Sequence, residues 1–229
     1  MLLEEERQAV VDYGMVMVRA GLTTGTGGNL SCCDRVRGLM AISPSGVPYD
    51  ALRPQDVVVV DLDGNIVDGG LKPSSEIGFH RALYHHRAAI GGIVHTHSVY
   101  ATTLACLNCE LPPIHYLVGF AGHKVPVAPY ATFGTDALAH NIRQTMGDDF
   151  NAVLLANHGL VAVGADLTHA FNTAEEVEFV ARVFCQAKAI GDPVMLGDDE
   201  MTRVIEKFKT YGKQDLSLIH ISEPTRPSP

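Results

Sequence analysis

Apolar residues recur along this chain with two periods, and the longer period predicts its helices. Helical spacing of apolar and polar positions extends over residues 5–20, 76–86, 136–146 and 170–190. Each of these segments places apolar side chains on one face, as a helix packed on a core requires. We expect Ser74 or Ser75 to cap the second helix, because a serine hydroxyl often accepts a free N–H group at a helix start.

Short β-branched runs between these segments predict strands. Residues 57–62 form one such run, which stops at the hairpin signal Asp63-Gly64. Residues 91–97 and 152–158 are two further apolar runs, and each ends in histidine. Helices and strands alternate without an internal repeat or a linker. The sequence therefore predicts one α/β domain over residues 1–214, with a mixed sheet covered by helices on both sides.

The two histidines near the end of the first of these runs predict a metal site. Side chains alternate faces along a strand, so His95 and His97 point the same way and Thr96 points away. His158 ends the second run, and Glu76 lies at the start of a predicted helix. Three imidazoles and a carboxylate suit a zinc-like ion with an open position for substrate. The alternative is that His158 only ends a buried strand and Glu76 only decorates a helix.

Polar segments rich in glycine and serine predict an anion-binding site. Glycines let backbone N–H groups approach an anion closely, and a helix start favours negative charge. Each segment alone is more often a turn or a cap. The candidate phosphate-binding residues are Thr26, Gly28, Asn29, Ser45, Gly46, Ser74 and Ser75.

Composition and charge narrow the classes of function. A chain with 46% hydrophobic and 19% charged residues is not disordered, and no apolar run reaches the roughly 20 residues that span a bilayer. A net charge of −9 argues against a nucleic-acid partner. The early residues Glu4, Glu5 and Glu6 are unlike a secretory leader, and five cysteines, an odd number, favour a reducing cytoplasm. Cys106 and Cys109 form a CxxC without a second pair, so we expect no zinc there.

The last fifteen residues differ in character from the rest. Residues 224–229 contain three prolines, which cannot continue a helix. We treat residues 215–229 as an atypical tail, appended rather than part of the domain, and exclude them from the fold argument.

Taken in order, the motifs resemble those of the class II aldolase/adducin-like sugar-phosphate enzymes over about residues 5–213. So many matches in the same order are specific to this family. The matching segments are residues 25–31, 43–46, 72–76, 95–98, 114–116, 128–135, 157–160 and 206–212.

The resemblance implies a fold, a cofactor and roles for individual residues. It implies a largely antiparallel central sheet and one Zn²⁺ per subunit, held by His95, His97 and His158. Glu76 would ligate the ion at rest and then shuttle a proton. Tyr116 would donate to the aldehyde oxygen of the product. The resemblance also implies a homotetramer with the active site near a subunit boundary, and no membrane or nucleic-acid partner.

Near the C-terminus, Tyr211 matches the tyrosine that family members bring to a neighbouring subunit's site. The expected partner is a small sugar phosphate. Family members that cleave L-fuculose 1-phosphate into dihydroxyacetone phosphate and L-lactaldehyde are the most similar. A close deoxyketose phosphate such as 5-deoxyribulose 1-phosphate is an alternative. A ribulose-phosphate 4-epimerase or a dehydratase on the same fold is a further alternative, and a non-catalytic adducin-like scaffold is disfavoured by the intact histidines and Glu76.

Overall fold

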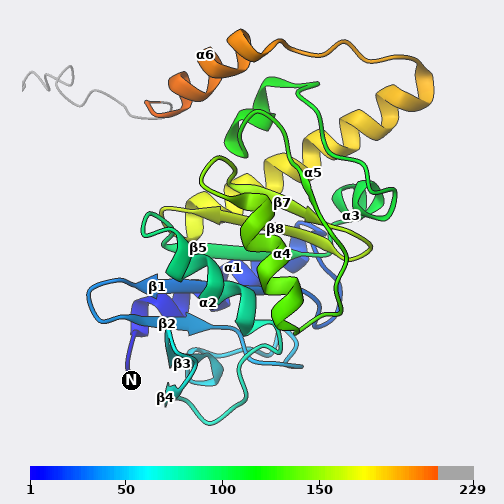
Figure 1. Ribbon diagram of the computed structural model, residues 1–229. Coiled ribbons are helices and arrows are strands. Elements are labelled where there is room, and N and C mark those ends of the chain that lie inside the picture. The colour runs from blue at the N-terminus through cyan, green and yellow to red at the C-terminus, as the bar shows by residue number, and fades with distance from the viewer. Residues whose placement is uncertain (211–229) are drawn as a thin grey trace, which may run out of the picture.

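Within the part of the chain that the structure describes, eight strands form one mixed sheet in the order β4-β3-β2-β1-β5-β8-β7-β6 (Figure 1). The structure, a computed structural model, describes residues 1–210. Every neighbouring pair is antiparallel except β6 and β7, which are parallel, so the expected largely antiparallel sheet is confirmed. The strands are β1 (Asn29–Asp34), β2 (Leu39–Ile42), β3 (Val58–Asp61), β4 (Ile66–Asp68), β5 (Gly92–Thr96), β6 (Val127–Ala128), β7 (Ala152–Leu155) and β8 (Gly159–Gly164).

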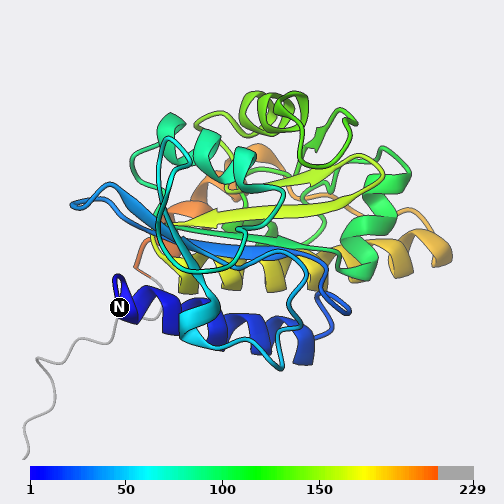
Figure 2. The ribbon, with the colours of Figure 1, turned by 90° about the horizontal axis from the view of Figure 1, so that it is seen from below.

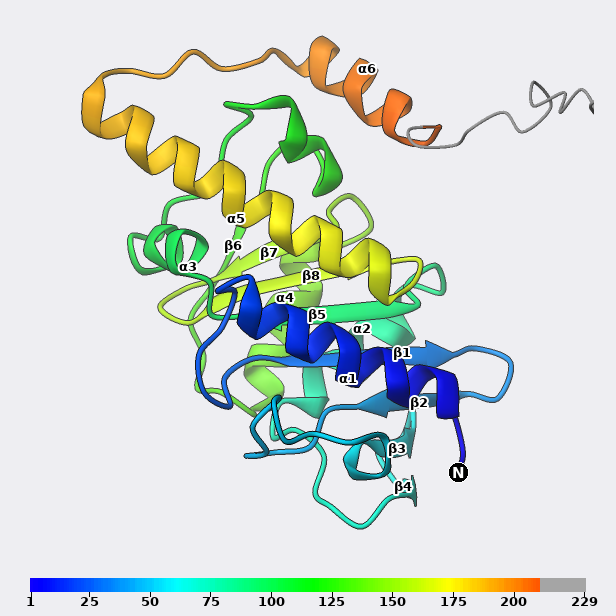
Figure 3. The ribbon, with the colours of Figure 1, turned by 180° about the vertical axis from the view of Figure 1, so that it is seen from behind.

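Helices cover both faces of this sheet, as the sequence predicts. The helices α1 and α5 lie on one face (Figure 3), and α2 and α4 lie on the other, which Figure 2 shows with the sheet seen nearly edge-on. The four predicted helices are all present, with ends within three residues of the expected ones. The helices are α1 (Glu4–Arg19), α2 (Ile77–His86), α3 (Val99–Cys106), α4 (Asp136–Met146), α5 (Leu167–Ile190) and α6 (Asp198–Phe208), with the 3-10 helices η1 (Pro54–Asp56) and η2 (Tyr116–Phe120).

Strict alternation in the central strands produces two hydrophobic cores, one on each face of the sheet. In β5, Val94 belongs to the core beneath α1 and α5, while its neighbour Ile93 belongs to the core beneath α2 and α4. In β8, Ala162 and Val163 divide between the cores in the same way. Because alternation continues along β5, His95 lies on the face that α2 and α4 cover.

The two local turn signals have different outcomes. The hairpin signal is confirmed, because β3 pairs antiparallel with β4 across it. The predicted serine cap on α2 is wrong, because the helix begins at Ile77 and the cap position is Glu76, without a side-chain capping bond. The Ser74 hydroxyl instead accepts the Glu76 N–H at 3.2 Å. Such a bond closes a local turn before the helix, so no serine side chain caps the helix start itself.

The described part of the chain contains neither a membrane-spanning helix nor a disulfide. Among residues 1–210, no helix combines the length and the apolarity needed to cross a bilayer. All five cysteines lie in this part, and each is a free thiol. Within the CxxC, Cys106 is exposed and Cys109 is partly buried.

The start of α5 packs against β5 so closely that only glycine fits between them. A methyl group at Gly92 would meet the backbone of Asp166 and Leu167 at the beginning of α5. Backbone atoms cannot swing aside as the end of a side chain can. The packing of α5 on the sheet therefore depends on the absence of a side chain at this position.

We predict that Gly92→Ala lowers the free energy of unfolding by about 1–3 kcal/mol, the usual range for overpacking a core. Urea unfolding of both proteins measures the difference. Gly70→Ala is the matched control, because Gly70 is exposed and has nothing within 4 Å of an added methyl group. Equal losses in the two variants would contradict the close packing of α5 on β5.

Candidate active site

Three histidines from the central strands converge on one point at the end of the sheet. His95 is the fourth residue of β5, His97 follows the end of that strand, and His158 lies in the turn between β7 and β8. One ring nitrogen from each lies within 4.8 Å of the others. The two sequence runs that end in histidine are therefore brought together by the fold, although β8 separates their strands in the sheet.

Glu76 completes this cluster from the start of α2. Its Oε2 lies 3.3 Å from His95 Nε2, and its Oε1 lies 3.5 Å from His158 Nε2. His95 Nε2 and His97 Nε2 are 3.1 Å apart. Ligand nitrogens about 2 Å from a tetrahedral ion lie roughly 3.3 Å from each other, so these separations fit a shared divalent cation.

One buried oxygen of this carboxylate supports the same interpretation. Glu76 Oε1 is buried and has no hydrogen-bond partner among the described residues. A buried oxygen of an ionised group is costly without a partner, and a cation would supply one. The donor set of three imidazoles and a carboxylate is the set that zinc-like ions prefer.

A hydrogen bond on the far side of His95 fixes which of its nitrogens faces the cluster. His95 Nδ1 lies 2.9 Å from the Leu160 carbonyl oxygen, which can only accept, so Nδ1 carries the proton. Nε2 is then the nitrogen that would hold an ion, and it points at Glu76 and His97. Orientation of a ligating imidazole by a backbone carbonyl is the usual arrangement at metal sites.

The protonation states at neutral pH suit a metal site. Burial opposes ionisation of Glu76, but the hydrogen bond and charge of His95, with His158 and Asn29, outweigh it and lower the pKa of Glu76 to about 2. Burial, followed by the neighbouring His95, lowers the pKa values of His97 and His158 to about 4. The carboxylate is therefore ionised and these two imidazoles are neutral, as metal ligands must be.

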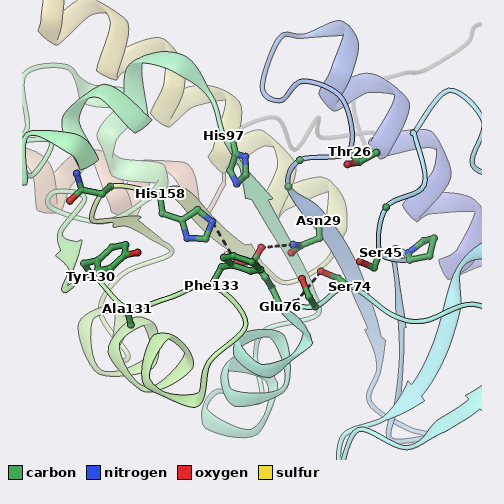
Figure 4. Close-up of a pocket in the computed structure, with 16 residues that line it drawn as sticks. Thr26, Asn29, Ser45, Ser74, Glu76, His97, Tyr130, Ala131, Phe133 and His158 are labelled. Carbon is green, nitrogen blue, oxygen red and sulfur yellow. Dashed lines mark hydrogen bonds and ion pairs between the residues drawn. The ribbon is translucent and has the colours of Figure 1, made fainter.

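A cavity of about 360 Å³ opens onto the cluster. Figure 4 shows Glu76, His97 and His158 on one side of it and Thr26 and Ser45 on the other. All seven predicted phosphate-binding residues lie on its wall, so the fold brings the glycine- and serine-rich segments to the metal cluster. The lining residues are Thr26, Gly27, Gly28, Asn29, Pro44, Ser45, Gly46, Ser74, Ser75, Glu76, His97, Tyr130, Ala131, Phe133, Asn157 and His158.

The wall near the serines has the features of an anion site. Gly28 and Gly46 have positive φ angles of 71°, a left-handed conformation that turns backbone N–H groups in directions other residues rarely adopt. No side chain caps the start of α2. The Ile77 and Phe79 N–H groups donate to the Ser74 and Glu76 carbonyl oxygens, so Gly78 between them is the residue of this turn whose N–H group stays available. Free N–H groups at a helix start favour negative charge.

Tyr116, one of the two predicted catalytic tyrosines, is not among the residues that line this cavity. Tyr116 lies in η2, is half exposed, and stacks on His115 with ring centroids 4.6 Å apart. Its other ring neighbour is Phe208 of α6. Tyr211 lies outside the described residues, as do residues 215–229. The roles of both tyrosines stay predictions.

Sequence reasoning assigned no role to two residues of the site. Tyr130 is exposed and lines the cavity together with Phe133. His80, on α2, is fully buried and hydrogen-bonded to Asn29. The spacing of Asn29 and Ser31 on a strand, with His80 four residues after Glu76 on a helix, was the signal that could have found it.

Comparison with known proteins agrees with this geometry. The family model described as "Class II Aldolase and Adducin N-terminal domain" matches residues 8–185. A 5-deoxy-D-ribulose 1-phosphate aldolase from Bacillus thuringiensis serovar kurstaki is 50% identical over 214 residues, which cover 93% of this chain and 100% of that protein. An L-fuculose phosphate aldolase from Escherichia coli strain K12 is 42% identical over 205 residues, covering 89% and 94%. A solved structure of an L-fuculose 1-phosphate aldolase has a TM-score of 0.89 and 47% identity, covering 91% of this chain and 98% of that one.

We predict that His95→Ala abolishes stoichiometric metal binding, because it removes one of three imidazole ligands and leaves an open face on the ion. Metal content after dialysis, measured by atomic emission, tests this. His140→Ala is the matched control, because it removes an exposed imidazole on α4, away from the cluster. Full occupancy in the His95→Ala protein would rule out His95 as a ligand.

Proposed function

The chain belongs to the class II aldolase and adducin N-terminal domain family, and we propose that it is a zinc aldolase that cleaves a deoxyketose 1-phosphate between C3 and C4. One observation carries the proposal: the metal cluster and the candidate phosphate-binding residues line the same cavity. We call the latter, which are Thr26, Gly28, Asn29, Ser45, Gly46, Ser74 and Ser75, the phosphate cradle. A ketose 1-phosphate has its phosphate two carbons from C3. A substrate held by its phosphate at the serines therefore reaches the cluster with its C2 carbonyl and C3 hydroxyl.

The cradle binds and orients the phosphate. Backbone donors near Gly28 and Gly46 surround one side, and Ser74 with Ser75 supply hydroxyls at the start of α2. Charge-assisted hydrogen bonds to phosphate are short and directional, so they fix the rest of the sugar in the cavity. Such positioning accounts for a large share of the rate that an enzyme provides.

The cation site supplies the positive charge that the reaction needs. His95, His97 and His158 would hold the ion, with Glu76 as a fourth ligand at rest. A zinc ion bound there stabilises the enediolate that C3–C4 cleavage leaves on the dihydroxyacetone phosphate half.

Glu76 holds and moves the proton at C3. Its present contacts keep the pKa near 2, so it is a weak base while they last. When the carboxylate leaves the imidazoles, those contacts are lost, and burial then raises its proton affinity. A short movement of this side chain therefore converts it from a ligand into a group that can carry the proton, delivering it to C3 during cleavage and taking it from C3 in the reverse reaction.

Two substrates differ only in the aldehyde that they release. L-Fuculose 1-phosphate gives dihydroxyacetone phosphate and L-lactaldehyde, and it is our first candidate. 5-Deoxy-D-ribulose 1-phosphate gives the same phosphate with acetaldehyde. It is our second candidate, and the name of the relative that is 50% identical supports it. Both aldehydes end in a methyl group, which suits the exposed Tyr130 and Phe133 on the cavity wall.

We further propose a homotetramer in which neighbouring subunits complete the aldehyde end of the site. Tyr116 is half exposed and does not line the cavity of its own chain, so a role in protonating the aldehyde oxygen requires that another subunit present it. Tyr211 has the same proposed role from a segment outside the described residues. The cytoplasmic location also stays a prediction.

We predict that the zinc-loaded protein releases dihydroxyacetone phosphate from L-fuculose 1-phosphate or 5-deoxy-D-ribulose 1-phosphate. A panel of ketose 1-phosphates with coupled detection of dihydroxyacetone phosphate tests this, and the aldehyde identifies the preferred substrate. The unphosphorylated ketoses are the matched controls, since they cannot use the cradle. Conversion to an epimer or a dehydrated product without dihydroxyacetone phosphate would replace the aldolase proposal with the epimerase or dehydratase alternative.

We predict that Glu76→Gln lowers turnover by about 10²–10⁴, the usual contribution of a general acid–base group, because an amide can neither deliver a proton to C3 during cleavage nor take it from C3 in the reverse reaction. Steady-state kinetics with the preferred substrate measures the loss. Metal content is measured in parallel, and we expect the variant to keep its ion through the three histidines. Near-parental turnover would show that another group carries the proton.

A further inference from the structure

A chain of buried polar side chains connects Glu76 to the interior of the protein, away from the cavity. Asn29 and Ser31 point to the same face of β1, two residues apart, and His80 and Tyr84 lie one turn apart on α2. The packing of α2 on β1 brings these four side chains together. Each is buried, and His80 is completely inaccessible.

The hydrogen bonds form an unbroken series. Asn29 Nδ2 donates to Glu76 Oε2 at 2.9 Å, and His80 Nε2 lies 2.6 Å from Asn29 Oδ1. On the other side of the imidazole, His80 Nδ1 lies 2.7 Å from Ser31 Oγ. Ser31 Oγ in turn lies 2.8 Å from the Tyr84 hydroxyl.

The charge of Glu76 sets the direction of every bond in this series. An ionised carboxylate can only accept, so the Asn29 amide must face it with its nitrogen and face His80 with its oxygen. His80 Nε2 must then carry the proton. His80 Nδ1 accepts from the Ser31 hydroxyl. The single hydrogen of the Tyr84 hydroxyl then points to Ser31, whose Oγ lies 2.8 Å and whose carbonyl oxygen lies 3.1 Å from it.

His80 is suited to this arrangement because it stays neutral. Burial lowers the pKa of His80 to about 3, with a smaller contribution from His95. A neutral imidazole carries one proton, and Ser31 donating to Nδ1 holds that proton on Nε2.

We propose that His80 is a positioning residue for the aldol cleavage, which locks the Asn29 amide with its nitrogen toward Glu76 and the cavity. The inference rests on the proposed function, and no contact of His80 with substrate is involved. Without the lock, the amide could turn over and place its oxygen against the carboxylate. That orientation would repel Glu76 and would present an acceptor instead of a donor to the phosphate.

The lock links phosphate binding to the proton shuttle through one nitrogen. Asn29 Nδ2 has two hydrogens, and one is used by Glu76. Asn29 also lines the cavity beside the candidate phosphate cradle. The second hydrogen is therefore available to the phosphate, and a correctly oriented amide serves both groups together.

Two substitutions at His80 separate the lock from simple packing. The amide nitrogen of His80→Gln can replace Nε2 as the donor to Asn29, whereas the shorter side chain of His80→Asn reaches only the Ser31 side. Both variants remove a fully buried imidazole, so each controls for the other. Neither touches a metal ligand, and we expect equal metal content in both.

The test uses the zinc-loaded protein and the exchange of a C3 hydrogen of dihydroxyacetone phosphate with D₂O, followed by proton NMR. This half-reaction reports Glu76 without an aldehyde, and calorimetric titration with dihydroxyacetone phosphate reports the cradle. We expect His80→Asn to lose about 10- to 100-fold in the exchange rate and to bind the phosphate more weakly, the usual size of effects on groups that orient a site. We expect His80→Gln to restore most of both.

Equal losses in the two variants, or a parental rate in His80→Asn, would overturn the lock while the parent still releases dihydroxyacetone phosphate. A parent that neither releases it nor exchanges its hydrogen would instead overturn the proposed function. Nitrogen-15 NMR of the parent gives a readout that does not depend on the folding of any variant. The lock requires the Nε2–H tautomer of His80 at neutral pH, and finding the Nδ1–H tautomer would rule it out.

Discussion

The buried carboxylate of Glu76 is the constraint around which this part of the fold is organised. An ionised group away from water must be compensated by donors or by positive charge. Here Asn29 on β1 donates a hydrogen bond to it, and His95 on β5 and His158 on the β7–β8 turn lie 3.3 Å and 3.5 Å from its oxygens, where a shared cation would supply positive charge. Because these partners belong to separate segments, the same contacts hold the start of α2 against the sheet. The geometry of the site and the packing of the domain are therefore secured together.

The opposite face of the sheet also determines where the ligands lie. His97 is followed immediately by α3, and the first N–H groups of that helix, at Tyr100 and Ala101, donate to Glu178 of α5. A helix from the other layer thus fixes the path of the chain just beyond His97. Gly159 leaves room for the backbone of Thr96 and the His97 ring, because a methyl group at this position would meet both. Changes far from the cavity can therefore disturb the metal site through packing alone.

The parts of the site that depend on short-range rules could be predicted from the sequence. Strand alternation was enough to pair His95 with His97, and the order of the family's motifs identified the cavity wall. What it missed depends on contacts between distant segments. The burial of His80 follows from the packing of α2 on β1, and the distance of Tyr116 from the cavity follows from the path of the chain between α3 and β6. The predicted serine cap on α2 is wrong for a local reason, because Ser74 closes a turn one step before the helix.

The distribution of burial explains how such a site can change substrate without changing chemistry. The residues proposed to hold the cation and orient Glu76 lie on or next to central strands between two hydrophobic cores, where substitutions disturb packing. Tyr130 and Phe133, by contrast, lie on an exposed segment at the cavity mouth. Exposed segments on a rigid scaffold tolerate substitution far better than core strands. Relatives named for two different ketose phosphates are compatible with such a division.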